Sequence, residues 1–363
     1  MKSGLDVIPA KSGVQIAALD SRLRGNDVSR ESSINNARVP RMLRLPKNRF
    51  YLSPAVLMLT LVCCAGVSAA PPLSQVAVPA AGATLLSDQN PSTSATPGDV
   101  LRDENLVAWC IVPFDKAKRG PAERALMLKE LGITRCAYDW RQEHVPTFEQ
   151  EILEYKKQGI EYFAFWSTHD DALALFQKHD LHPQIWQMIG GDTGTTDAEK
   201  TENAAKAMTA LAQRTAELKC PLGLYNHGGW TGEPRNLVAV CRRLREMGFP
   251  HVGIVYNFHH GHDHIADWKE SFELMKPYLL CLNLNGMNDG AQPKILGIGK
   301  GQHELDMIRV VTESGYRGPI GIIDHREELD ARESLQENLD GLRWVRKELQ
   351  QPGSGGPAPQ KKN

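Results

Sequence analysis

The feature that most constrains the fold of this chain is a regular alternation between apolar runs and amphipathic segments. The amphipathic segments carry apolar residues mostly at i, i+3, i+4 and i+7, the spacing of one helical face. Several of them end at a glycine shortly before the next apolar run, as helices often do. The apolar runs, which have the length of buried strands, occupy residues 106–112, 133–138, 161–166, 183–189, 222–226, 252–257, 279–285 and 319–324.

Eight strand-then-helix units between residues 105 and 350 predict a (β/α)8 TIM barrel, a fold of the α/β class. The alternative is an open, doubly wound sheet. No predicted strand is followed by the GxGxxG turn that marks many such sheets, so the barrel is favoured.

Composition limits the classes of partner. The chain has 363 residues, of which 41% are hydrophobic and 23% charged, enough for one large or two small domains with an ample core. Its formal net charge is -1, so no basic field exists to attract nucleic acid or an anionic membrane. We therefore expect no nucleic-acid partner.

The first part of the chain is predicted to lie outside the fold. Residues 6–28 resemble the translation of a dispersed intergenic repeat, which makes residues 1–41 a spurious upstream extension with the true start at Met42. Residues 42–70 read as a signal peptide, because basic residues precede an apolar segment that ends in VSAA, with cleavage near Ala69 or Ala70. This pattern predicts export, to the periplasm or as a secreted protein.

Two other interpretations of the apolar segment are weaker. A membrane anchor needs a span of about 20 apolar residues, and this run is shorter and contains Pro54. A lipoprotein would use Cys63 or Cys64, but the LVCC sequence lacks a small residue before the modified cysteine. No stable membrane span is expected after cleavage of the signal.

Two further segments have the composition of unstructured chain. Residues 71–104 are rich in Pro, Ala, Ser and Thr and show no sustained period, which predicts a flexible linker. Residues 351–363 have the same character and are predicted to be a disordered tail. The folded barrel is accordingly expected over residues 105–350.

Polar residues gather where the predicted strands end. In a TIM barrel these carboxyl ends form the rim on which sites are built. Amides there can exchange hydrogen bonds with sugar hydroxyls without adding charge, and nearby tryptophans offer either a flat wall for a sugar ring or packing between barrel and helices. The polar residues are Asp139, Arg141, Ser167, His169, Gln187, Asn226, His227, Asn257 through His264, Asn283, Asn285, Asp324, His325 and Arg326.

The HHGHDH segment at residues 259–264 raises the question of a metal. His227, His260 and Asp324 could form a two-histidine, one-carboxylate set for a transition metal. No recognised ligand spacing such as HExxH is present. Three interpretations stay open, namely a bound transition metal, a metal-free polar pocket and a solvated histidine loop.

Four segments carry a family resemblance. LGLYNHGG, VGIVYNFHHG, ILGIGKGQHELDMIRVV and GPIGIID resemble segments of the xylose isomerase-like superfamily, which includes sugar phosphate isomerases and epimerases. The resemblance implies a TIM barrel over residues 105–350. It also places the family's divalent metal ligands, usually Glu, Asp, His and Glu, at Tyr225, Asn257, Asn283 and Asp324. A one-residue slip would turn Asn226 inward in place of Tyr225.

These positions depart from the family pattern. Three anionic ligands have become one, and Mg²⁺ and Mn²⁺ depend on carboxylate oxygens. The usual site is therefore expected to be weakened. If a cofactor is bound, we expect one divalent transition metal, Zn-like or Mn, held by His227, His260 and Asp324.

The resulting hypothesis is an exported sugar isomerase or epimerase-like enzyme that transfers a proton next to a carbonyl. His260, Asp324 and His227 are the catalytic candidates. Asn257 is expected at a solvent-facing mouth, where an alanine would cost little stability. The candidates for binding the carbohydrate are Tyr225, Asn226, Asn257, Asn283, Asn285 and Trp230.

Two competing hypotheses belong to other classes. The first is a non-catalytic carbohydrate-binding barrel with a degenerate metal site. The second is a DNA-repair nuclease, which the family's endonuclease-like members bring to mind but which conflicts with export and with the near-zero net charge.

Overall fold

The computed structural model describes residues 99–360. The predicted upstream extension and signal peptide, residues 71–98 of the predicted linker and residues 361–363 of the tail lie outside the described residues. Within residues 99–360, no helix is long and apolar enough to cross a membrane.

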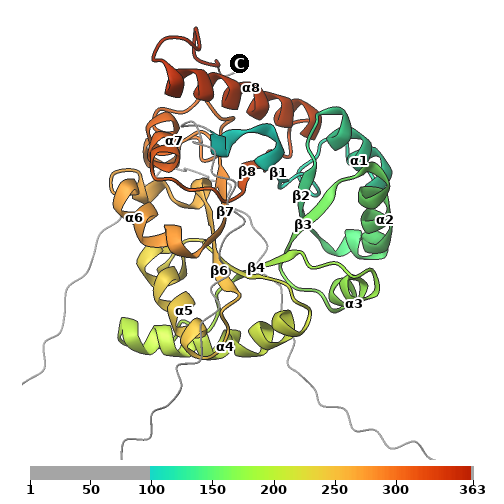
Figure 1. Ribbon diagram of the computed structural model, residues 1–363, viewed down its shortest axis with the longest axis vertical. Helices are drawn as coiled ribbons and strands as arrows, with labels where there is room; N and C mark the ends of the chain where they lie inside the picture. Colours follow the sequence, from blue (N-terminus) through green and yellow to red (C-terminus); the bar gives the residue numbers. More distant parts are fainter. Residues whose placement is uncertain (1–98, 361–363) are drawn as a thin grey trace, which may run out of the picture. The chain divides into compact units, whose positions relative to one another are not determined.

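Eight parallel strands close into a barrel in which each strand pairs with the next along the chain and β8 pairs with β1 (Figure 1). The predicted TIM barrel is therefore confirmed. The strands are β1 Leu106–Trp109, β2 Arg135–Asp139, β3 Glu161–Trp166, β4 Gln184–Met188, β5 Leu222–Tyr225, β6 Val252–Asn257, β7 Leu279–Leu284 and β8 Ile320–Ile323.

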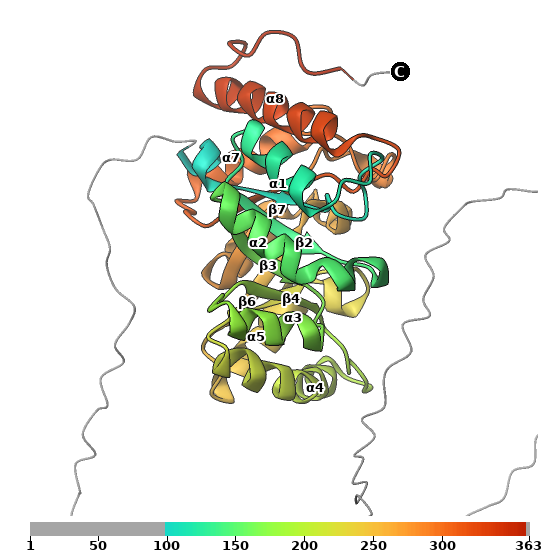
Figure 2. The same ribbon diagram turned by 90° about the vertical axis from the view of Figure 1, so that its right-hand side faces the viewer.

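A helix follows each strand, and the helices form an outer ring around the barrel, as Figures 1 and 2 show from two sides. Gly159 closes α2 in the left-handed conformation, with φ 71°, as its place in the sequence predicts. The helices are α1 Pro121–Glu130, α2 Phe148–Gln158, α3 Asp170–Lys178, α4 Asp197–Glu217, α5 Pro234–Glu246, α6 Trp268–Met275, α7 Glu304–Glu313 and α8 Ala331–Gln350.

The strands alternate between two cores. Residues such as Leu106 and Ala108 pack toward the helices, whereas their neighbours Val107 and Trp109 belong to a separate cluster. That second cluster draws on all eight strands, which can meet only inside the barrel. Its members are Val107, Trp109, Cys110, Ala137, Phe163, Ala164, Trp186, Tyr225, Val255, Cys281 and Ile323.

The ordered chain extends beyond the predicted 105–350 boundaries at both ends. Leu101 is fully buried, and Asn105 Nδ2 donates to the Val100 carbonyl at 2.7 Å. Beyond α8, the Trp344 indole donates to the Gly356 carbonyl at 3.1 Å, so residues that follow α8 fold back on it. The composition of these ends did not reveal their anchoring contacts.

All five cysteines in the described residues are buried free thiols. Cys110, Cys136 and Cys281 lie in apolar strand segments of the sequence and are buried among apolar side chains. Burial raises the pKa of the Cys136 thiol to about 12, so at neutral pH it is a core residue without nucleophilic character.

Candidate active site

A cavity of about 200 Å³ lies at the carboxyl ends of the strands. It is smaller than the roughly 300–1,000 Å³ common for drug-sized ligands, so it suits a small molecule. Its lining follows β1, β2, β3, β5, β6 and β8 and consists of Trp109, Cys110, Phe114, Asp139, Arg141, Trp166, Tyr225, His227, His259, His260 and His325.

Three non-glycine residues beside this cavity adopt positive φ. They are Cys110 with φ 59°, Ser167 with φ 60° and His325 with φ 42°. Each follows the end of a barrel strand at once or after one residue, where the chain turns out of the sheet. Such backbone strain is unfavourable by about 1–3 kcal/mol per residue and often gathers at functional sites.

Asp139, the last residue of β2, is the only carboxylate in the cavity lining. Its side chain is 2% exposed, and its Oδ1 accepts a long hydrogen bond from the Val112 N–H at 3.4 Å. Its Oδ2 has no hydrogen-bond partner. Burial raises the pKa of Asp139 to about 6, while the nearby positive charge of Arg141 acts in the opposite direction. The carboxyl is thus placed to exchange a proton near neutral pH.

Arg141 lies two residues farther along and also lines the cavity. Its guanidinium carbon is 5.3 Å from the centre of the Phe114 ring and 5.6 Å from that of Trp166. One of its nitrogens, Nη1, donates to the Trp140 carbonyl at 2.7 Å. The guanidinium is therefore close to two aromatic rings of the cavity lining, which favour a cation there.

Four histidines also line the cavity, namely His227, His259, His260 and His325. The ring centres of His259 and His260 are 3.7 Å apart, and those of His227 and His260 are 4.4 Å apart. Burial, and then mutual repulsion, lowers the pKa of His260 to about 2, and burial lowers that of His325 to about 4. At neutral pH these rings are uncharged and can donate or accept hydrogen bonds without adding positive charge.

The structure brings three of the predicted site residues to the cavity, namely Tyr225, His227 and His260. Tyr225 points into the barrel, as the unshifted register of strand five predicts. Its ring centre is 6.1 Å from that of His260.

Three of the predicted sugar-binding residues, all asparagines, form hydrogen bonds with one another and do not line the cavity. Asn226 Oδ1 accepts from the Asn257 N–H at 2.7 Å and from Asn257 Nδ2 at 2.8 Å. Asn283 Nδ2 donates to Asn257 Oδ1 at 2.8 Å. All three side chains are fully buried, so the expectation that Asn257 faces solvent is wrong.

Gly321 on β8 makes room for this row of amides. It pairs with Asn283 across the sheet. A Cβ at position 321 would lie 1.6 Å from Asn283 Oδ1. Any larger residue would therefore collide with the row.

The remaining three candidates lie outside the cavity lining. Asn285 is buried and donates to the Gly286 carbonyl at 2.8 Å. The Trp230 indole donates to Asp197 at the start of α4, at 2.8 Å. Asp324 directly follows Ile323, whose side chain points into the barrel. Arg326 Nε lies 3.8 Å from Asp324 Oδ1. Burial raises the pKa of Asp324 well above the ordinary value.

The residues at the family's metal positions do not fit a divalent cation. Asn257 and Asn283 use their amide groups on each other, and Asp324 is directed away from the barrel interior. In the part of the chain that the structure describes, no three His, Cys, Asp or Glu residues are placed to hold a metal ion. The predicted set of His227, His260 and Asp324 is therefore not assembled, because the strand-eight side chain points to the other side of the sheet.

Several lining residues were not selected from the sequence. Asp139 and Arg141 stood out only as polar residues after a strand, and His259 and His325 as members of a polar loop. The sequence did carry a sign of this pair: Asp139 and Arg141 are two residues apart at the end of an apolar run, and side chains two residues apart in a strand face the same side. Of the tryptophans near strand ends, Trp109 and Trp166 line the cavity.

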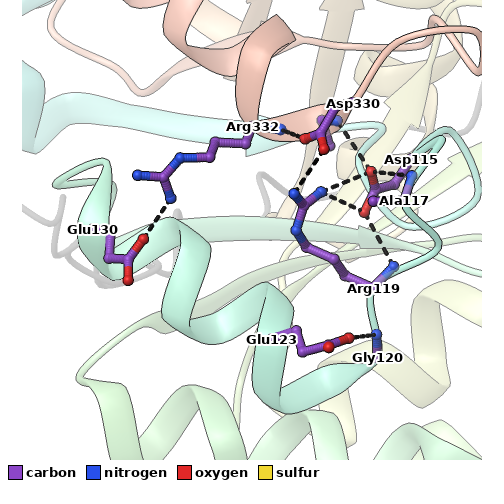
Figure 3. Close-up of polar contacts among 9 residues, drawn as sticks. Asp115, Ala117, Arg119, Gly120, Glu123, Glu130, Asp330 and Arg332 are labelled. Carbon is purple, nitrogen blue, oxygen red and sulfur yellow. Dashed lines mark hydrogen bonds and ion pairs between the residues drawn. The ribbon is translucent and has the colours of Figure 1, made fainter.

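A network of charged groups holds one wall of the cavity in place (Figure 3). Asp115, in the loop after β1, accepts from Arg119 Nη1 at 2.9 Å and from the Ala331 N–H at 3.1 Å. Arg119 Nη2 also donates to Asp330 at 2.9 Å, so the loop is tied to the start of α8. The adjacent Phe114 ring lies 3.9 Å from that of His325. The network therefore fixes the position of Phe114 against His325.

We expect Arg119→Met to lower the free energy of unfolding by about 1–2 kcal/mol, because the buried Asp115 loses its charged partner but keeps backbone donors. The matched control is Arg332→Met, which breaks an exposed ion pair with Glu130 in the same region (Figure 3) and should cost about 0–1 kcal/mol. Urea denaturation measures both. Equal losses in the two variants would show that the Asp115 network has no special part in holding the loop.

Comparison with solved structures identifies the same fold in other proteins. The IOLI protein with a binding zinc atom aligns at 11% identity over 68% of this chain and 99% of its own, with a TM-score of 0.53. The 3-keto-D-glucoside 4-epimerase from E. coli aligns at 14% identity over 67% of this chain and 98% of its own, with a TM-score of 0.50. A xylose isomerase domain containing protein from Salmonella typhimurium aligns at 12% identity over 67% of this chain and 98% of its own, with a TM-score of 0.50.

Sequence comparison adds no relative, since no protein-family model and no curated protein matches the chain. At these low identities the structural likeness establishes the fold. The fold that the resemblance implies is confirmed: residues 99–360 form a closed barrel of eight parallel strands.

Proposed function

We propose that the cavity binds a small sugar and catalyses proton transfer at the carbon next to its carbonyl, as isomerases and epimerases do. The observation that carries this proposal is Asp139, a buried carboxyl with a free Oδ2 in the lining of a small cavity. A general base works best when its pKa is near the working pH, and that of Asp139 is raised to about 6.

The proposed chemistry needs only groups of this chain and solvent water. Asp139 takes the proton from the carbon, the C–H electron pair forms a C=C bond, and the carbonyl oxygen becomes an enediolate oxygen. Return of the proton to the former carbonyl carbon, with transfer of the hydroxyl proton from the neighbouring oxygen to the enediolate oxygen, gives an isomer. Protonation of the original carbon on its opposite face by a solvent water, with the Asp139 proton neutralising the hydroxide that is left, gives an epimer. Neutral His227 and His260 can donate hydrogen bonds to the enediolate oxygen and to the sugar hydroxyls, and the positive charge of Arg141 in the same lining adds to the stabilisation of the enediolate.

The aromatic walls support a sugar as the substrate. Trp109 and Trp166 line the cavity and offer flat apolar faces of the kind that pack on the C–H face of a sugar ring. The structural neighbours named as epimerases or as a xylose isomerase domain protein agree with this assignment. Asp324, which the sequence pattern favoured as an acid or base, has no part in this proposal because it lies outside the cavity lining.

The test is exchange of carbon-bound hydrogen with solvent. Protein is incubated with a panel of aldoses and ketoses in D2O, and deuterium at the carbon next to the carbonyl is followed by NMR. We expect incorporation together with formation of an isomer or epimer. Sugar binding without exchange would favour the competing function, a non-catalytic carbohydrate-binding barrel.

We also propose that the protein is exported, on the signal-like pattern of residues 42–70. Expression from Met42 should give a mature chain that begins near residue 70 or 71 and is found outside the cytoplasm. Mass spectrometry of the purified N-terminus measures this. A chain that keeps residues 42–70 would contradict the proposal.

A further inference from the structure

The charges at the cavity mouth favour an anionic ligand. Arg141 is the permanent cation of the lining, and no carboxylate lies within salt-bridge distance of it among residues 99–360. The exposed Lys294 is near enough for its positive charge to lower the pKa of His227 and His260. Asp139 is the single carboxyl of the lining, so even when it is ionised the positive charges of Arg141 and Lys294 outnumber it. The mouth therefore carries more positive than negative charge.

Arg141 has hydrogen-bonding capacity left for that ligand. A guanidinium presents five N–H donors, and within residues 99–360 the only hydrogen bond of the Arg141 side chain is the one from Nη1 to the Trp140 carbonyl. The guanidinium carbon lies 5.3 Å and 5.6 Å from the centres of the Phe114 and Trp166 rings, which restrict its movement. A planar fork held in this way matches the two oxygens of a carboxylate.

A phosphate group has a poorer place to bind. Barrels often bind phosphate with backbone N–H groups of the loops after strands seven and eight, and here the Gly-rich residues 297–301 precede α7. That position is occupied by the protein's own Glu304. Its Oε1 accepts from the Gly301 N–H at 2.7 Å and its Oε2 from the Met287 N–H at 3.0 Å. The side chain is 1% exposed, so these donors are closed to a ligand.

We propose that the substrate is a sugar acid, a monosaccharide that carries a carboxylate, and that Arg141 binds this carboxylate. The proposal rests on the function proposed above and names its substrate class. Asp139 and Arg141 are two residues apart at one strand end, so both face the cavity. A carboxylate bound at Arg141 fixes the orientation of the sugar in the cavity that Asp139 also lines. Arg141 thus sets which sugars bind and how they are oriented toward the base.

The test compares ligand classes on the full chain. Binding of D-glucuronate and D-galacturonate, of the matching neutral hexoses and of hexose phosphates is measured by calorimetry and by the shift in melting temperature. Four proteins are used, namely the wild type, Arg141→Met, Arg141→Lys and Arg343→Met. The last is a matched control, because Arg343 is exposed on α8 and pairs with Asp340 on the same helix.

We expect wild type and Arg343→Met to bind the uronates more tightly than the neutral hexoses. Arg141→Met should weaken uronate binding about 10- to 100-fold, the worth of a charged hydrogen-bonded pair. Arg141→Lys should bind with intermediate strength, since it keeps the charge but loses the fork. Melting of each protein without ligand shows that the variants are folded, and Arg141→Lys keeps the test valid if Arg141→Met does not fold.

Three results would overturn the proposal, and they can be told apart. If neutral hexoses bind as tightly as uronates, and Arg141→Lys is unchanged, the sugar-binding function stands but the acid specificity fails. If hexose phosphates bind best, the anion is a phosphate. If no sugar of any class binds, the proposed function fails together with this inference.

Discussion

Asp139→Asn is expected to lower kcat by about 10²- to 10⁴-fold on any sugar that the protein turns over, the usual contribution of a positioned acid or base. The amide keeps the shape of the side chain but cannot accept the proton from carbon. Binding of the sugar should change far less, because the cavity walls and Arg141 are retained. Steady-state kinetics and calorimetry on the same preparation separate the two effects.

The pH dependence gives the same prediction a second measurement. The base must be deprotonated, so kcat/KM of the wild type should rise as pH passes through about 6. The positive charge of Arg141 lowers the pKa of Asp139 and so opposes the larger effect of burial. Arg141→Met should therefore move the rising limb to higher pH. A profile that stays flat between pH 5 and about 7 would contradict the role of Asp139.

As pH rises, the contribution of Asp139 to stability should fall while the activity that depends on its ionised form increases. The folded-state pKa of Asp139, about 6, lies above that of an unfolded aspartate, about 3.9. The folded state then binds the proton more tightly, so the contribution of Asp139 to stability falls as pH rises between about 4 and 6. Above that window Asp139→Asn removes an unfavourable buried charge. We expect the variant to be at least as stable as wild type at pH 7, so its loss of activity cannot come from unfolding.

Asp324→Asn tests which carboxyl is the base, because the sequence pattern favoured Asp324 and the cavity lining favours Asp139. Asp324 is fully buried like Asp139, and burial raises its pKa as well, but it lies outside the cavity lining. We expect its replacement to leave kcat within a few-fold of wild type. If Asp324→Asn abolished turnover while Asp139→Asn did not, the assignment of the base would be wrong.

The barrel was predictable because the spacing of apolar residues differs between its strands, which are continuous apolar runs, and its helices, which carry apolar residues on one face. Most predicted strands end within one or two residues of the observed ones, including β3 and β6, whose bounds are the same. The exception is the first, predicted to reach residue 112 but ending at Trp109. Cys110 takes a positive φ and turns the chain there. Apolar residues continue past this turn, so hydrophobicity alone gave no sign of the strand's end.

The candidate site was predictable in position but less so in its members. The sequence placed it at the carboxyl ends of the strands, where the cavity lies. It could not show which face of β8 carries Asp324, because a shift of one residue reverses the face. It also could not show that asparagines on neighbouring strands use their amides on each other. These are contacts between distant parts of the chain, and a pattern along one strand does not contain them.

That row of asparagines gives the second large expected effect: Asn257→Ala should lower the free energy of unfolding by about 2–4 kcal/mol. The alanine removes the acceptor of Asn283 Nδ2 and one donor to Asn226 Oδ1, and both remaining partners are fully buried. Asn283 Nδ2 loses its acceptor, which is unfavourable by about 1–3 kcal/mol, whereas Asn226 Oδ1 keeps the backbone N–H of residue 257. The vacated volume adds to the loss. Thermal and urea denaturation measure the loss.

The matched control is Asn288→Ala, in the loop after β7. Its amide donates to the Gln292 carbonyl at 3.3 Å and is partly exposed, so water can replace that bond. We expect a loss below about 1 kcal/mol there. If Asn257→Ala were no more destabilising than Asn288→Ala, yet abolished sugar binding, Asn257 would be a ligand-contacting residue at an open mouth. Because all three amides are fully buried and bonded to one another, we expect the reverse: a protein that melts at lower temperature and still binds the sugar below its melting point.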